Sequence, residues 1–132
     1  MKKLTREWVQ KAEEDMAAAQ RLAKAKPVLN GAVCFHCQQA AEKYFKALLQ
    51  ETGLPIPYIH DLVDLLAILL AKDTSLKELQ EGLAELTHFA VDTRYPGKKA
   101  SIQDSRSSLK LAEKVRKEIR TRLGLRDRRR SS

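Results

Sequence analysis

Two histidines and one arginine are the residues of this sequence best suited to acid–base chemistry. The chain has three histidines, at positions 36, 60 and 88. Imidazole exchanges a proton near neutral pH, and the planar guanidinium of arginine binds phosphate through two parallel hydrogen bonds. A cleft that combines His36, His60 and Arg94 would therefore place proton-transfer groups beside a phosphate-binding group. His88 is expected near a helix end, in a capping or solvent-facing role.

A second group of residues is suited to binding a nucleotide or an RNA phosphate. Its members supply positive charge, an amide and a flat ring on which a base can stack. They are Lys43, Lys46, Arg94, Gln39 and Tyr95.

Part of this group also has a purely structural interpretation. Glu42 precedes Lys43, and a carboxylate and an ammonium can satisfy one another when both are desolvated. Arg94 can likewise pair with Glu42 or Asp61 and fix the turn that follows it. Glu42 and Asp61 then belong to a polar network that specifies the fold and binds no ligand. The sequence leaves both interpretations open.

The two cysteines, Cys34 and Cys37, form a single Cys-x-x-Cys pair. A structural zinc site needs four ligands, and a thioredoxin-like site needs a strand before its helix. We therefore interpret Cys37 as a core residue and Cys34 as incidental, and we expect neither a metal nor a cofactor.

Apolar residues that recur every three or four positions must present these groups on helices. The predicted helix starts are residues whose side chains can cap a helix: Thr5, Asn30, Asp61, Ser75 with Glu78, and Ser101 with Asp104. Pro27 ends the first helix, and Gly53 follows the second near Thr52. Trp8 begins an apolar stripe that we assign to the core. The pattern predicts an all-α fold, an antiparallel up-and-down bundle of four to five helices.

The positive charge is concentrated at the C-terminus. The chain has 25 Lys and Arg against 17 Asp and Glu, a net charge of +8. Six arginines and one aspartate between residues 120 and 132 account for five of these charges. We predict one domain over residues 1–125 and a basic tail over 126–132, which either binds RNA or an acidic partner or stays solvated.

The cysteine count and the apolar runs predict the cellular localisation of the protein. Two cysteines do not make a secreted disulfide scaffold, and no N-terminal apolar segment resembles a signal peptide. The longest apolar run, residues 65–71, is far too short to span a membrane. We therefore expect a cytoplasmic protein that does not enter the membrane.

Phe35 and Leu49 fall within or beside the polar face of the second helix, where a monomer would expose them to water. Exposed apolar side chains of this kind indicate a partner surface. The alternative is that a loop or the C-terminal helix covers them.

The run from Cys34 to Leu49, CFHCQQAAEKYFKALL, resembles the second helix of HEPN domains (higher eukaryotes and prokaryotes nucleotide-binding). Two further stretches match in order, His60-Asp61-Leu62 and Arg94-Tyr95-Pro96, and the resemblance spans roughly residues 5 to 120. It implies a helical bundle that often forms a homodimer.

The resemblance implies one of two activities. Some HEPN domains are ribonucleases with an arginine a few residues before a histidine, but here Arg94 follows every histidine, so catalysis is not expected. Small prokaryotic HEPN proteins instead act with a minimal nucleotidyltransferase in a toxin–antitoxin-like pair, with nucleotide or RNA-phosphate binding as their proposed role. The alternatives are a ribonuclease with an atypical His and Arg cleft, and a structural dimerisation module.

Overall fold

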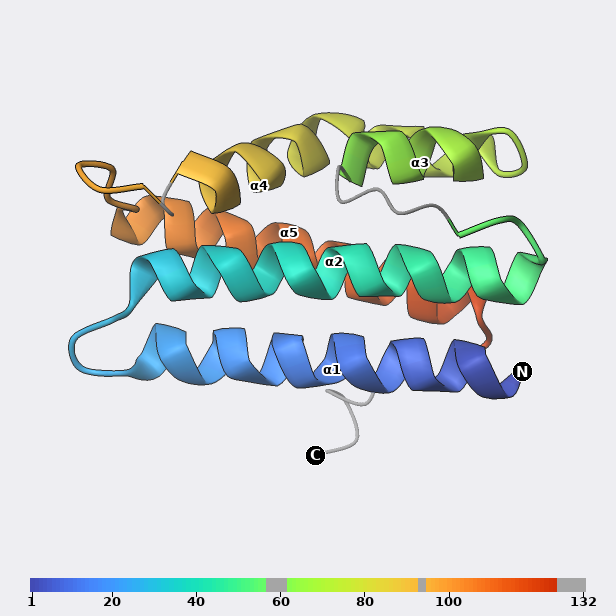
Figure 1. Cartoon of the computed structure of the whole chain (residues 1–132), viewed down its shortest axis with the longest axis horizontal. Coiled ribbons are helices and arrows are strands. Elements are labelled where there is room, and N and C mark those ends of the chain that lie inside the picture. The colour runs from blue at the N-terminus through green and yellow to red at the C-terminus, as the bar shows by residue number, and fades with distance from the viewer. Residues whose placement is uncertain (57–61, 93–94, 126–132) are drawn as a thin grey trace.

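The computed structural model of the chain describes residues 1–56, 62–92 and 95–125. In these residues the chain forms helices and no strand, so the predicted all-α fold is confirmed. In chain order the elements are α1 (Lys3–Lys24), α2 (Asn30–Thr52), α3 (Leu62–Leu70), the 3₁₀ helix η1 (Thr74–Leu79), α4 (Gln80–Asp92) and α5 (Ile102–Arg122). The long helices α1, α2, α4 and α5 alternate in direction, as an up-and-down bundle requires (Figure 1).

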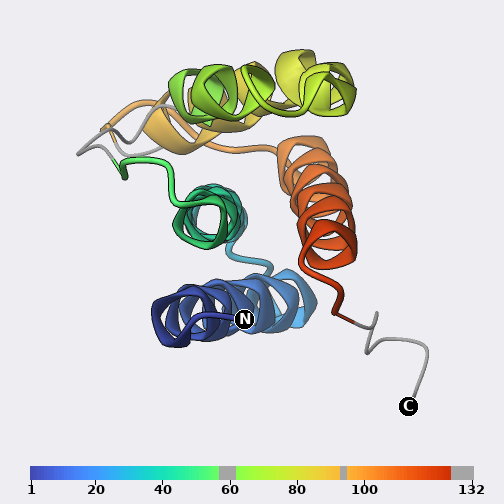
Figure 2. The same ribbon diagram turned by 90° about the vertical axis from the view of Figure 1, so that its right-hand side faces the viewer.

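Helix α2 lies at the centre of the bundle. In the end-on view, α1 lies on one side of it, α3 and α4 on the opposite side, and α5 on a third (Figure 2). Thirteen of its 23 residues are buried, and they include the polar residues Gln38, Glu42 and Lys46. Because neighbours cover three sides of this helix, few of its polar residues stay partly exposed to water, among them His36, Gln39, Lys43 and Gln50.

This central position corrects one sequence prediction. Leu49 is fully buried in the hydrophobic core, so the expectation that a monomer exposes it is wrong, and the alternative that neighbouring elements cover it is correct. Its role in an interface stays a prediction. Phe35 is half-buried, and its ring meets the ring of His36 edge-on at 5.3 Å between centroids. The core is formed by large side chains that are fully shielded from water, among them Met16, Tyr44, Phe45, Leu49, Leu62, Leu65, Leu66, Leu83, Leu86 and Ile119.

Some of the predicted helix ends are confirmed and others are wrong. Ser101 and Asp104 form the expected capping box of α5, and Gly53 ends α2 with a φ of +77°, which favours glycine. Thr5 is no cap, because it lies inside α1 and its hydroxyl donates to Glu51 at 2.9 Å. Ser75 and Glu78 do not form the expected capping box, because Asp73 caps η1 and α4 begins only at Gln80.

Buried charges tie α5 to α1. Arg116 and Arg120 are each only 5% exposed. The Nε of Arg116 lies 3.1 and 3.2 Å from the two carboxylate oxygens of Glu13, and Nη1 of Arg120 lies 2.8 Å from one of them. One carboxylate of α1 therefore holds two guanidinium groups of α5.

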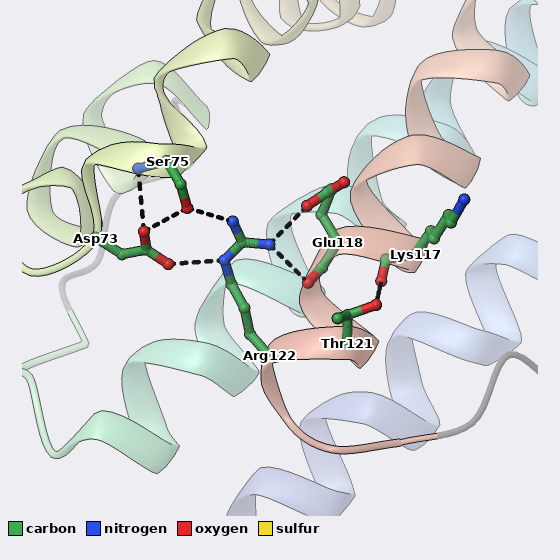
Figure 3. Close-up of polar contacts among 6 residues, drawn as sticks. All are labelled: Asp73, Ser75, Lys117, Glu118, Thr121 and Arg122. Atoms are coloured by element: carbon green, nitrogen blue, oxygen red, sulfur yellow. Dashed lines mark hydrogen bonds and ion pairs between the residues drawn. The ribbon is translucent and has the colours of Figure 1, made fainter.

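Arg122 holds the last turn of α5 against the start of η1 (Figure 3). Its Nε donates to Asp73 at 2.8 Å, and its Nη2 donates to the Ser75 hydroxyl at 2.6 Å. Its Nη1 donates to both the backbone carbonyl and the carboxylate of Glu118. The guanidinium thus connects the end of α5 to the turn that follows α3.

Acid should remove the stability that this contact supplies. Hydrogen bonds from Ser75 and then from Arg122 lower the pKa of Asp73 to about 2. The pKa of an unfolded aspartate is about 3.9. The stabilisation from this contact is therefore fully present above that pH and is lost as the pH falls to about 2. Between these values, the free energy of unfolding should fall more steeply with acid in wild type than in Asp73→Asn. Urea unfolding at several acidic pH values measures this difference, and parallel curves would contradict it.

Within the described residues, no helix is both long and apolar enough to cross a bilayer. Residues 126–132 lie outside the described part of the chain, so the boundary between domain and tail stays a prediction.

Candidate functional site

Most of the predicted site residues of α2 lie along its contact with α1. On α2 they follow one another at steps of three or four residues, which places them on one side of the helix. On α1 the facing residues also recur at helical spacing. We call this strip the α1/α2 seam, and its members are His36, Gln39, Lys43, Lys46 and Gln50 of α2 with Trp8, Lys11 and Asp15 of α1.

Asp15 joins two of the predicted residues at one end of the seam. Its Oδ1 lies 2.9 Å from Nδ1 of His36, and its Oδ2 accepts a hydrogen bond from Nζ of Lys43. The side chain of Asp15 is 13% exposed, against 30% for His36 and 24% for Lys43. A carboxylate beneath a histidine fixes the orientation of its ring, which leaves Nε2 directed away from Asp15.

Lys46 is the most buried cation of the seam. Its Nζ donates to Oε2 of Glu42 at 3.1 Å, and it lies 5.3 Å from the centroid of the Trp8 ring. The ring attracts the ammonium through its negative face. Glu42 thus pairs with Lys46 one turn along α2, whereas Lys43 pairs with Asp15. The predicted network of Glu42 with Asp61 stays a prediction.

A pocket opens beside Trp8. It has a volume of about 520 Å³, and its lining combines apolar side chains with charged ones: Leu4, Glu7, Trp8, Lys11, Lys46, Gln50 and Ile56. Lys11 is exposed, and its ammonium has no hydrogen bond or ion pair to the described part of the chain. The pocket therefore presents an aromatic ring together with an available cation.

This pocket corrects the assignment of Trp8 to the core. Val9, Ala12, Met16 and Ala19 form the buried face of α1, whereas Trp8 is half-buried and lines the pocket. Trp8, Lys11 and Asp15 are the residues of the seam that sequence reasoning missed. Their spacing along α1 was visible, but which side of α1 meets α2 was not.

The structure brings together only part of the predicted phosphate site. Lys43 and Lys46 are near one another, but each already pairs with a carboxylate. His60, Asp61 and Arg94 lie outside the described residues, so their roles stay predictions.

Tyr95 is 64% exposed in the segment after α4. Further along that segment, Lys98 and Lys99 line a shallow pocket with Asn30 and Gly31, at the N-terminal end of α2. Lys46 lies in the C-terminal half of α2, and Trp8 of α1 lies beside it. The ring expected to stack on a base is thus not among the residues that line the pocket beside Trp8.

Both cysteines are buried and reduced. Burial raises the pKa of each thiol, and the Ser108 hydroxyl donates to the Cys34 sulfur at 3.3 Å. Cys37 lies in the hydrophobic core. Across residues 1–56, 62–92 and 95–125, no three His, Cys, Asp or Glu side chains are grouped as a metal site requires.

Comparisons with known proteins identify the family. The chain resembles the solved structure of TT1696 from Thermus thermophilus, with a TM-score of 0.75 and 24% identity, and the match covers 89% of this chain and 96% of that one. It also resembles ST0689, an archaeal HEPN homologue, with a TM-score of 0.74 and 22% identity, and that match covers 92% of this chain and 98% of the other. A comparison with curated proteins found no match. A family model for the HEPN domain matches residues 5–122, which confirms the resemblance seen in the sequence of α2. The chain therefore belongs to the HEPN domain family.

Proposed function

We propose that this HEPN domain binds a nucleotide, either free or at the end of an RNA, in the α1/α2 seam. The observation that carries the proposal is the pocket that combines the Trp8 ring with the Lys11 ammonium. Its volume of about 520 Å³ falls within the range of about 300–1,000 Å³ that is typical of small-molecule sites.

The lining of the pocket suits the two halves of a nucleotide. Leu4, Trp8 and Ile56 offer an apolar surface for a base, and stacking on an aromatic ring is favourable for every base. Lys46 lies over the Trp8 ring and is held by Glu42, so it keeps the ring oriented. Lys11, which also lines the pocket, supplies the charge that a phosphate needs.

Binding without catalysis is the activity that we favour. The ribonuclease motif of the family requires an arginine a few residues before a histidine. Here Arg6 and Arg21 lie too far before His36, and Arg94 follows all three histidines. The hydrogen bond between Asp15 and His36 orients an imidazole. However, no arginine of the described residues contacts that imidazole, so this pair alone does not favour a nuclease.

Calorimetric titration with AMP tests the proposal. We expect measurable heat at about millimolar AMP and about 5- to 150-fold weaker binding for Trp8→Ala, because stacking contributes about 1–3 kcal/mol per base. Lys11→Gln should weaken binding by about tenfold. Lys117→Gln is the matched control, since it removes the same charge from the exposed side of α5. Absence of heat from wild type, or equal losses in Lys11→Gln and Lys117→Gln, would count against the seam.

We also propose that the protein forms a homodimer and acts with a minimal nucleotidyltransferase in a toxin–antitoxin-like pair. The resemblance to small prokaryotic HEPN proteins supports the pairing, and the half-buried ring of Phe35 is a candidate contact. An adjacent gene for a nucleotidyltransferase would support this part of the proposal.

A further inference from the structure

The carboxylate of Asp15 is contacted by two partly exposed side chains, those of His36 and Lys43. Asp15 is the least exposed of the three, and His36 and Lys43 approach its two different oxygens. One carboxylate charge is thus shared between an ammonium and an imidazole. The charge that this cluster presents to a ligand depends on whether the imidazole is protonated.

The hydrogen bond to Asp15 determines what His36 offers to the solvent. An ionised carboxylate only accepts hydrogen bonds, so Nδ1 of His36 carries the proton in this pair. In the neutral ring, Nε2 then has a lone pair, which repels an anion. Protonation converts Nε2 into a donor and changes the formal charge of the three side chains from zero to one positive charge.

We propose that Asp15, His36 and Lys43 form an oxyanion site for a phosphate group, and that this site opens when His36 is protonated. The inference rests on the proposed function, because the cluster belongs to the same seam as the nucleotide pocket. It adds that acid strengthens binding there, with the protonated Nε2 of His36 and the Lys43 ammonium as the two donors.

The surroundings of His36 support a site controlled by this one group. It contacts Asp15 of α1 and the Phe35 ring of α2, and it shares the Asp15 carboxylate with Lys43. Lys11 lies one turn before Asp15 and adds a positive charge nearby. Within the described residues, Asp15 is the carboxylate in contact with His36, and no charged group of α3, α4 or α5 contacts it.

The position of the cluster suits the phosphate end of a ligand whose base lies against Trp8. His36 and Lys46 are ten residues apart on α2, or about 15 Å along the helix axis at 1.5 Å per residue. Lys43 lies between them, closer to Lys46. A phosphate chain that leaves the pocket along the seam therefore passes Lys43 before it reaches His36.

Sulfate is the best first probe, because it stays a dianion across the pH range in which a phosphate monoester changes charge. Calorimetry of the full chain should show about tenfold tighter sulfate binding at about pH 5.5 than at about pH 8, at constant ionic strength. His36→Gln should remove this difference, since glutamine can still donate to Asp15 but does not titrate. His88→Gln, which changes an exposed histidine of α4, should keep it.

A measurement on wild type guards against a variant that fails to fold. At one fixed pH, addition of sulfate should increase the fraction of His36 that is protonated on both ring nitrogens, as read from side-chain ¹⁵N NMR signals. Equal sulfate affinity at both pH values, or a rise that persists in His36→Gln, would overturn the inference.

The same titrations separate this inference from the proposed function. AMP binding that depends on Trp8, together with sulfate binding that ignores pH, would leave the nucleotide pocket in place and remove the acid-opened site. Sulfate binding that depends on His36, without any heat from AMP, would leave the acid-opened site in place and remove the nucleotide pocket.

Discussion

Leu49→Ala should lower the free energy of unfolding by about 2–5 kcal/mol, the usual cost of truncating a leucine in a close-packed core. Leu49 is fully buried in the cluster that the central helix α2 shares with its neighbours. Its loss leaves a cavity that several helices would have to close together, and a helix surrounded on several sides cannot shift toward all of them. Urea unfolding followed by circular dichroism measures the change.

Leu29→Ala provides the matched control. Leu29 is 50% exposed just before α2, so the same truncation should change stability by less than about 0.5 kcal/mol. A small effect at Leu49, together with a change in sedimentation, would instead favour the interface that its place in the sequence pattern suggests. Both variants keep the charge and the length of the chain, so the comparison isolates burial.

The end of α2 and the start of α5 could be predicted because local chemistry determines them, whereas Asn30 makes no capping hydrogen bond at the start of α2. Gly53 ends α2 in the left-handed conformation, and the Ser101 and Asp104 side chains reciprocally bond the backbone at the start of α5. The start of η1 was missed because Asp73, two residues before Ser75, offers a carboxylate that competes for the same backbone group. Aspartate and serine are about equally good caps, so the sequence does not determine which of them is used.

The role of each side of α2 could not be predicted from periodicity. A helical wheel assumes one buried face and one exposed face, and α2 is packed against α1, α3, α4 and α5. Glu42 and Lys46 therefore look like surface residues in the sequence, although they are only 3% and 8% exposed. Phe35 and Leu49 have similar positions in the pattern, but only Leu49 lies deep in the core.

For a related reason, the α2 residues of the α1/α2 seam could be predicted and its α1 residues could not. The residues of α2 carry the family motif, so His36, Gln39, Lys43 and Lys46 could be singled out from the sequence. Their partners depend on the register between α1 and α2. This register is determined by packing over the whole length of both helices, so Trp8, Lys11 and Asp15 could be placed only in the folded chain.

The pair formed by Glu42 and Lys46 carries the second large prediction. Glu42→Ala should destabilise the domain by about 3 kcal/mol, because it removes the carboxylate that accompanies a nearly buried ammonium. This value lies at the low end of the cost of breaking a buried ion pair, since Lys46 lines the pocket beside Trp8 and its long side chain can turn toward water there. Urea unfolding at neutral pH measures the loss.

A double replacement separates the charge of this pair from its packing. Glu42→Leu combined with Lys46→Met fills a similar volume without charge, and it should recover most of the stability that Glu42→Ala loses, because an apolar pair needs no desolvation of ions. The same double variant should bind AMP less tightly than wild type, since the Trp8 ring loses the cation that orients it. Recovered stability with weakened AMP binding would mean that the buried charges serve the pocket rather than the fold. Stability that stays low in the double variant would show instead that the bundle itself depends on the ion pair.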